Sequence, residues 1–129
     1  ESEWEYMATN GGITKYPWGD KMYKSFANLN YSGNICPVNK YEEGDNNLGI
    51  RQLFGNVWEW CQEAIYPYDG FIIDPIYREF SYPFFGFKKI LRGGCWAVPD
   101  ILINSRYRNA QNPENRIQYT GFRVIKDII

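Results

Sequence analysis

The sequence predicts an α+β fold made of short strands, few helices and long ordered loops. Apolar residues have helical spacing only near the beginning of the chain, and three short segments have the period of strands. The segments between them are rich in Gly, Asn, Pro and Tyr and follow no sustained period, which is typical of irregular structure. Aromatic residues make up 19% of the chain, so rings should fill much of the core.

The first predicted element is a short helix over residues 1–9. Trp4, Met7 and Ala8 are spaced i, i+3 and i+4, and the first turn is acidic. The Asn-Gly-Gly sequence at residues 10–12 should end this helix. Residues 13–45 then predict a long irregular loop, of the kind that is usually functional or stabilised by a ligand.

Three strands are expected in the rest of the chain. Residues 53–61 have the alternation of a half-buried strand, with Trp58 and Trp60 facing one side. After a second long loop over residues 65–87, residues 89–94 predict a strand that ends in two glycines. The paired glycines indicate positive φ angles or a close approach of the backbone. Residues 121–125 predict the final strand.

Composition excludes several function classes. Fourteen basic and fifteen acidic side chains nearly cancel, so neither nucleic acid nor a membrane is expected as a partner. The three cysteines are an odd number without CxxC spacing, which argues against disulfides and zinc and favours the cytoplasm. The chain has no histidine, which excludes Ser-His and Cys-His catalysis and the two-His-one-carboxylate iron site within these residues.

Five sequence blocks carry a resemblance to a known family. The chain resembles the formylglycine-generating, or sulfatase-modifying-factor, superfamily, whose fold is a variant of the C-type lectin fold. The blocks occur in the family's order, at residues 3–6, 16–19, 55–60, 91–94 and 121–123. The resemblance implies a single domain over residues 1–129 that lacks the first strands of the family domain.

A second set of blocks is similar to the ergothioneine-type sulfoxide synthases within this superfamily. These enzymes use the fold as a C-terminal domain beside a helical bundle that carries iron. The similar segments are residues 68–71, 74–81, 83–86 and 107–109, followed by Pro113 and Arg116. The resemblance implies a substrate-binding domain for a thiol and a histidine-derived betaine, inactive without an N-terminal helical domain whose histidines hold the iron.

The same resemblance assigns roles to individual residues. Tyr77 aligns with a catalytic tyrosine that donates a proton or electron near the iron-bound oxygen, and Phe80 replaces a second tyrosine. Asn109 matches a residue that holds the betaine carboxylate, and Gln111 replaces part of an aromatic or Trp-Asp pair. Arg116 lies among arginines that could clamp a substrate carboxylate.

The arrangement of these residues can be stated as an expectation. If the enzyme interpretation is right, the loops that carry Tyr77 and Asn109 should meet at one end of the domain and border a cleft. The alternative for Tyr77 is a packed ring whose hydroxyl bonds a backbone carbonyl. For Arg92 and Arg123, which lie within strand-like motifs, the favoured interpretation is that they stack on aromatic rings and tie loops together.

A structural calcium site is a further implication of the family. The resemblance places the backbone carbonyls of Phe54, Gly55 and Val57 around the ion together with the Glu59 carboxylate. Calcium prefers such hard oxygen ligands. The alternative is that Glu59 forms a salt bridge or caps local N–H groups.

Formylglycine generation is disfavoured. Members with that activity carry two metal-binding cysteines where this chain has Val98 and Ile103, and Cys95 is expected to be a small buried hydrophobic residue. Two hypotheses therefore stay open, the sulfoxide-synthase domain and a non-catalytic, lectin-like binding module that presents its long loops to a protein or small ligand.

Overall fold

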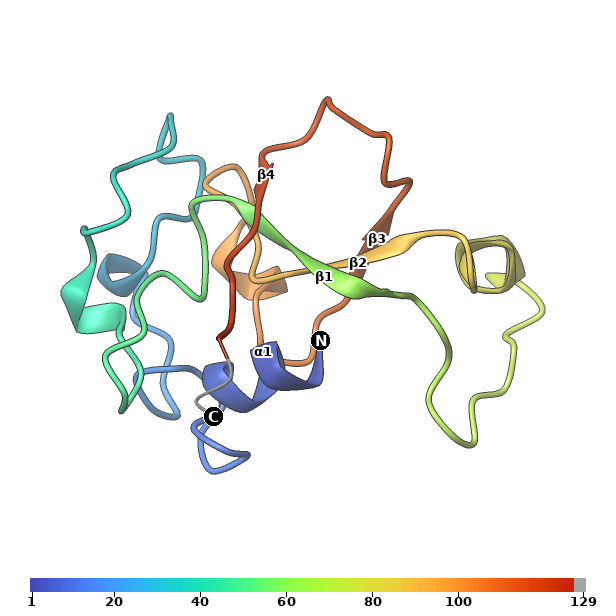
Figure 1. Ribbon diagram of the computed structural model, residues 1–129, viewed down its shortest axis with the longest axis horizontal. Helices are drawn as coiled ribbons and strands as arrows, with labels where there is room; N and C mark the ends of the chain where they lie inside the picture. The colour runs from blue at the N-terminus through green and yellow to red at the C-terminus, as the bar shows by residue number, and fades with distance from the viewer. Residues whose placement is uncertain (127–129) are drawn as a thin grey trace.

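A four-stranded mixed sheet organises the structure, a computed structural model that describes residues 1–126 (Figure 1). The order of the strands is β3-β2-β1-β4. The β1–β2 and β2–β3 pairs are antiparallel, whereas β1 and β4 are parallel. The strands are β1 (Trp58–Ala64), β2 (Lys89–Arg92), β3 (Asn109–Gln111) and β4 (Thr120–Gly121).

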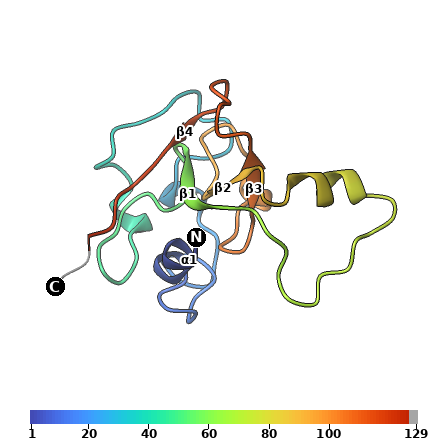
Figure 2. The ribbon, with the colours of Figure 1, turned by 45° about the vertical axis from the view of Figure 1, so that its right-hand side comes forward.

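The predicted helix is confirmed as α1 (Ser2–Ala8), which lies across one face of the sheet (Figures 1 and 2). Its apolar side is buried, with Trp4 5% and Ala8 0% exposed. Thr9 ends the helix: its hydroxyl donates to the Glu5 carbonyl and accepts from the Gly12 amide. No helix within residues 1–126 has the length and hydropathy of a membrane span.

Short 3₁₀ turns account for the remaining helical structure, so the long segments are loops as predicted. They are η1 (Lys24–Phe26), η2 (Glu42–Gly44), η3 (Arg78–Phe80), η4 (Tyr82–Phe84) and η5 (Asp100–Leu102). The core between them is aromatic, as the composition predicts. Phe54 is 1% exposed, and its ring lies 5.7 Å from Trp4, 5.9 Å from Tyr16 and 5.8 Å from Trp18, measured between centroids.

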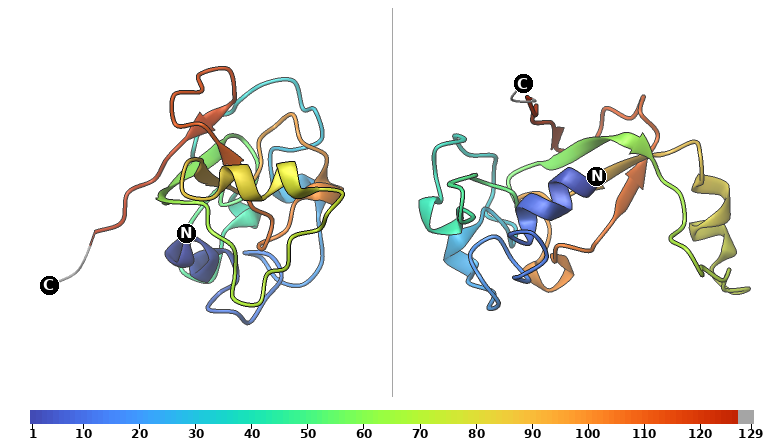
Figure 3. Two further views of the ribbon diagram at one scale, coloured as in Figure 1. Left: turned by 90° about the vertical axis from the view of Figure 1, so that its right-hand side faces the viewer. Right: turned by 60° about the horizontal axis from the view of Figure 1, so that its bottom comes forward.

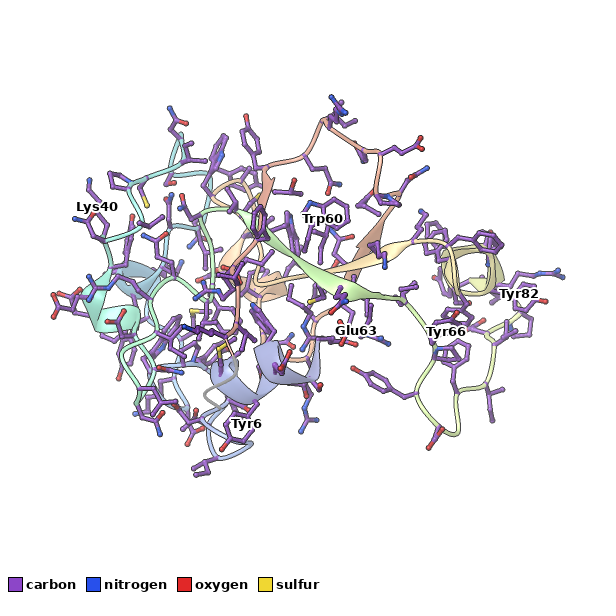
Figure 4. The ribbon with its side chains drawn as sticks, in the orientation of Figure 1. Tyr6, Lys40, Trp60, Glu63, Tyr66 and Tyr82 are labelled. Atoms are coloured by element: carbon purple, nitrogen blue, oxygen red, sulfur yellow. The ribbon has the colours of Figure 1, made fainter. Side chains whose placement is uncertain are left out.

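Two strand boundaries differ from the prediction. The strand expected over residues 53–61 begins only at Trp58, because Gly55 and Asn56 have φ angles of 77° and 63°, which a strand cannot contain. Successive side chains point to opposite sides, since Glu59 bonds a residue of α1 whereas Trp60 projects away from α1 (Figure 4). The predicted half-buried pattern is not observed, because Trp58 and Glu59 are both buried. The final strand contains only Thr120–Gly121, and the sequence analysis did not identify β3.

Residues 65–87 form a projection that we call the arm. It leaves the end of β1, carries η3 and η4, and returns to β2 (Figures 1 and 3). Two backbone hydrogen bonds close its root, from Ile65 N to Lys88 O at 2.8 Å and from Gly86 N to Ile65 O at 3.0 Å.

The glycine pair after β2 has the geometry that the sequence predicts. Gly93 and Gly94 have φ angles of 89° and 81°. A Cβ atom on Gly93 would lie 2.5 Å from the Leu53 carbonyl oxygen, and one on Gly94 would lie 2.3 Å from Ile103 Cδ1.

We expect Gly94→Val to lower the free energy of unfolding by more than about 1 kcal/mol, because both the backbone angle and the space exclude a side chain. Urea denaturation followed by tryptophan fluorescence measures this. Gly49→Val is a suitable control, since Gly49 also has a positive φ of 73° but a Cβ there meets nothing within 4 Å. Equal midpoints for the Gly94 variant and the unmodified chain would contradict the steric argument.

Candidate functional site

Tyr77 and Phe80 lie on the outer part of the arm. Their side chains are 60% and 68% exposed, and their ring centroids are 6.4 Å apart. The alternative of a Tyr77 ring packed in the core is therefore wrong. The backbone around them is held locally, since Tyr77 N donates to Asp74 O and Phe80 N donates to Tyr77 O. The Tyr77 side chain is thus largely exposed rather than packed in the protein interior.

Asn109 and Gln111 occupy the two ends of β3. Asn109 pairs with Leu91 and Gln111 with Lys89, so the backbone of β2 fixes their positions. The Asn109 Oδ1 atom accepts from the amide of Ala110 at 2.8 Å, while its Nδ2 group makes no hydrogen bond within residues 1–126. Gln111 Oε1 accepts from Asn115 Nδ2 at 3.1 Å. Neither Asn109 Nδ2 nor Gln111 Nε2 donates a hydrogen bond within residues 1–126, so both side chains have donors free for a ligand.

Arg116 follows β3 in an exposed loop and forms no ion pair with another residue of the described part of the chain. Its guanidinium is therefore available for an anionic group. The loop that carries it, residues 112–119, rises over the sheet between β3 and β4 (Figure 1).

The structure brings the root of the arm, but not its outer turns, against the strand that carries Asn109. Arg108 Nη1 donates to the carbonyl of Tyr66 at 2.9 Å, and the Arg108 guanidinium carbon lies 4.4 Å from the centroid of the Tyr68 ring. The arm also has a cavity of about 480 Å³, lined only by arm residues: Ile73, Pro75, Arg78 and Tyr82. The cleft shared by the Tyr77 and Asn109 segments stays a prediction.

The carboxylate of Glu59 is engaged by two neighbours. It accepts from Trp4 Nε1 at 2.9 Å and from Arg123 Nε at 2.7 Å, and Arg123 Nη2 bonds its second oxygen. Glu59 is 8% exposed, so this is a largely buried ion pair. The side chain thus forms the salt bridge that was the alternative to a metal ligand.

The calcium site stays a prediction, and it now depends on backbone oxygens. Within residues 1–126 no three His, Cys, Asp or Glu side chains are grouped to hold a metal. The carbonyls of Phe54, Gly55 and Val57 accept none of the hydrogen bonds between loops of this part of the chain. Arg123, which already bonds both oxygens of the Glu59 carboxylate, would compete with a calcium ion for it.

Calcium binding can be tested by titration calorimetry on the chain after chelator treatment. If calcium binds at residues 54–59, Arg123→Gln should strengthen its binding, because the competing cation is removed from Glu59. The variant Arg51→Gln, which removes an arginine paired with Asp45, is the control. Heat of binding that is absent, or equal in both variants, would contradict the predicted site.

Two arginines link the sequence motifs to one another. Arg92 is 0% exposed and donates to Glu1 at 2.8 Å, to Glu5 at 2.6 Å and to the Ser105 carbonyl. Its guanidinium carbon lies 5.0 Å from the centroid of a Trp4 ring. Arg92 therefore has the expected stacking and linking role. Arg123 ties β1 to the carbonyls of Arg51 and Gln52, but within residues 1–126 it stacks on no aromatic ring. The sequence analysis did not identify Glu1, Glu5 and Glu59 as the partners of these arginines. Acidic residues within largely apolar motifs could have indicated them.

The cysteines do not form a reactive centre in the described residues. Cys36, Cys61 and Cys95 are free thiols. Burial raises the pKa of the Cys95 thiol above its ordinary value, and it does the same for the pKa of Cys61. Cys95 is 5% exposed and belongs to the hydrophobic core, as expected.

The sequence motifs that the ion pairs of Arg92 and Arg123 join belong to one family. The sulfatase-modifying factor enzyme 1-like domain family matches residues 1–128. The chain belongs to this family. Its α+β fold is accordingly of the formylglycine-generating-enzyme type, which confirms the expectation from the sequence.

Relatives in this family have several names. The chain is 35% identical to hercynine oxygenase of Mycobacterium tuberculosis over 99% of its own length and 32% of the relative's length. It is also 35% identical to serine/threonine-protein kinase Pkn1 of Chlamydia trachomatis, over 99% and 20% of the two lengths. Among solved structures, variable protein 1 of Treponema denticola matches with a TM-score of 0.73 and 27% identity, over 94% of this chain and 44% of that one.

Proposed function

We propose that this chain is the substrate-binding domain of an iron-dependent sulfoxide synthase that joins a thiol to a histidine-derived betaine. The 35% identity to a hercynine oxygenase along 99% of the chain carries the proposal. That relative is about three times as long as the matched segment, since the chain covers 32% of it. Because the chain has no histidine, the iron must be held by another, helical domain, as the resemblance implies.

The residues of this chain would bind and orient the substrates. Among the described residues, the Nδ2 group of Asn109 donates no hydrogen bond and the guanidinium of Arg116 forms no ion pair, so both suit the carboxylate of an amino-acid betaine. The exposed ring of Phe80 suits its trimethylammonium group, through a cation–π contact of about 0.5–2 kcal/mol. Gln111, which accepts a hydrogen bond from Asn115, would shape the loop between Asn109 and Arg116.

Tyr77 would hold and transfer a proton. Its side chain is 60% exposed and its ring centroid lies 6.4 Å from that of Phe80, so a substrate that rests on Phe80 would lie beside the Tyr77 ring. Iron on the partner domain, when bound, supplies the oxidising chemistry. Residues of this chain contribute the proton at the Tyr77 oxygen and the contacts that orient the betaine.

Other features of the proposal follow from composition and chemistry. Neither nucleic acid nor a membrane is proposed as a partner, because the charges nearly cancel, and the three free thiols favour the cytoplasm. Formylglycine generation is not proposed, since Val98 and Ile103 have no metal-binding atoms where that activity needs cysteines.

A non-catalytic binding module is the second candidate. Its support is that the domain also matches a protein named a kinase and a structure named a variable protein, and that the arm exposes many apolar side chains. The complete reading frame separates the two candidates. A helical segment with three histidines upstream of Glu1 favours the enzyme, whereas an upstream sequence without them favours the binding module.

The catalytic proposal predicts that the chain by itself does not turn over a thiol with a betaine. Purified chain, supplied with ferrous iron, oxygen, a thiol and the betaine, should give no sulfoxide by mass spectrometry, because it has no histidine to hold the iron. The same chain joined to its iron-bearing domain should give the product. Turnover by the isolated chain, or none by the joined protein, would refute the proposal.

A further inference from the structure

Arg108 joins three parts of the fold at the root of the arm. Its Nε and Nη2 atoms donate to the two carboxylate oxygens of Glu1, at 2.7 and 2.9 Å. Its Nη1 atom donates to the carbonyl of Tyr66 at 2.9 Å, and its guanidinium stacks over the Tyr68 ring at 4.4 Å. Each nitrogen of the Arg108 guanidinium therefore donates to an acceptor, and the plane of the guanidinium stacks on an aromatic ring.

This contact is connected to the core. The Glu1 carboxylate also accepts from Arg92, which is fully buried. Arg92 in turn belongs to β2, the strand that pairs with β3. A continuous path of ion pairs and hydrogen bonds therefore runs from the core through Glu1 and Arg108 to Tyr66 on the arm.

The rest of the arm has few attachments of this kind. Beyond the backbone bonds at Ile65 and Gly86, its large apolar side chains are exposed over most of its length (Figure 4 labels Tyr66 near the root and Tyr82 further out). They include Tyr66, Tyr68, Phe71, Ile72, Ile76, Tyr77, Phe80, Tyr82 and Phe87. The direction of the arm is therefore set mainly at its root.

We propose that Arg108 is a positioning residue that fixes the arm, and with it Tyr77, relative to β3 and Asn109. Arg108 directly precedes Asn109, so the residue that clamps the arm is next to the first residue of the strand predicted to hold substrate. A planar guanidinium can make the bidentate contact and the stacking together, whereas a lysine cannot. The catalytic consequence rests on the function proposed above, but the clamp itself does not.

Hydrogen exchange of the full chain tests the clamp without reference to activity. In Arg108→Lys and Arg108→Gln, the amides of Ile65, Phe80 and Gly86 should exchange about tenfold faster or more, while amides of β1 and β2 keep their rates. Arg108→Lys keeps the positive charge beside Glu1. Faster exchange of the arm amides in this variant would therefore be caused by the loss of the bidentate contact and of the stacking on Tyr68.

Arg51→Gln is the matched control. Arg51 also makes a bidentate contact, with Asp45, and donates to the Asn39 carbonyl, but in a distant loop. This variant should speed exchange only around residues 39–51. Arm amides that keep their rates in the Arg108 variants, or amides that all speed up equally, would overturn the proposal.

Kinetics of the joined protein then test the consequence for Tyr77. Arg108→Lys should lower kcat by about 10- to 100-fold, because misplacement of a catalytic group costs rate, with a smaller change in KM for the betaine. An arm that loosens while kcat is unchanged would overturn the positioning role. If the unmodified joined protein forms no sulfoxide, the proposed function fails, and the exchange result still decides whether Arg108 holds the arm.

Discussion

Arg92→Met is expected to lower the free energy of unfolding by about 3 kcal/mol, since it leaves the Glu5 carboxylate and the Ser105 carbonyl without the cation that bonds them. Arg92 is 0% exposed and is the only described cation bonded to Glu5, whereas Glu1 keeps its contact with Arg108. Methionine can fill part of the volume above Trp4, so the loss reports mainly on the missing charge and hydrogen bonds. Urea denaturation followed by circular dichroism measures it.

Lys24→Met provides the comparison. Lys24 is paired with Asp100 at 3.8 Å, but its side chain is 78% exposed. Its removal should cost about 0–1 kcal/mol, as for other surface ion pairs. Similar small losses for both variants would show that Arg92 does not join α1 to the sheet as the structure indicates.

Tyr77→Phe, assayed in the joined protein, is expected to lower the rate of carbon–sulfur bond formation by about 10²–10⁴-fold, the usual contribution of a positioned proton donor. Only one hydroxyl is removed, and the side chain is 60% exposed, so folding should be unaffected. Rapid-quench measurement of product formation, with denaturation as a check on folding, gives both quantities.

Tyr82→Phe is the matched control for this experiment. Tyr82 lies on the same arm, is 64% exposed and loses the same hydroxyl. The catalytic assignment predicts that this variant keeps its activity. Equal rates in the two variants, whether both high or both low, would remove the special role of Tyr77.

Local patterns in the sequence were enough to predict several elements. The spacing of Trp4, Met7 and Ala8 predicted α1, and an apolar run before two glycines predicted β2. The aromatic core also follows from composition. These features depend on residues that are close in the chain, so period and turn chemistry are sufficient to find them.

Features that depend on distant residues were not predictable in the same way. β3 has only three residues and forms because it pairs with β2, not because of its own pattern. The late start of β1 follows from the left-handed backbone of Gly55 and Asn56. Asn56 is held in that conformation by hydrogen bonds that its side chain accepts from Asn28 and Cys36, which lie far earlier in the chain.

The candidate site shows the same division. The family resemblance identified Tyr77 and Asn109 but could not say that Tyr77 is exposed or that Arg108 connects their segments. Likewise Glu59 was identified as a ligand or salt-bridge residue, and only the fold shows that Arg123, 64 positions later, is its partner. Pairing of charges across such separations is a property of the tertiary structure.

The attachment of α1 has a consequence for the order in which the chain can fold during synthesis. A helix of seven residues is too short to be stable by itself in water. Its buried cation, Arg92, is made 87 residues after Glu5, and Glu59 is made 55 residues after Trp4. Residues 2–8 therefore become helical late, after β1 and β2 have been made, and until then Trp4 is available to chaperones or proteases.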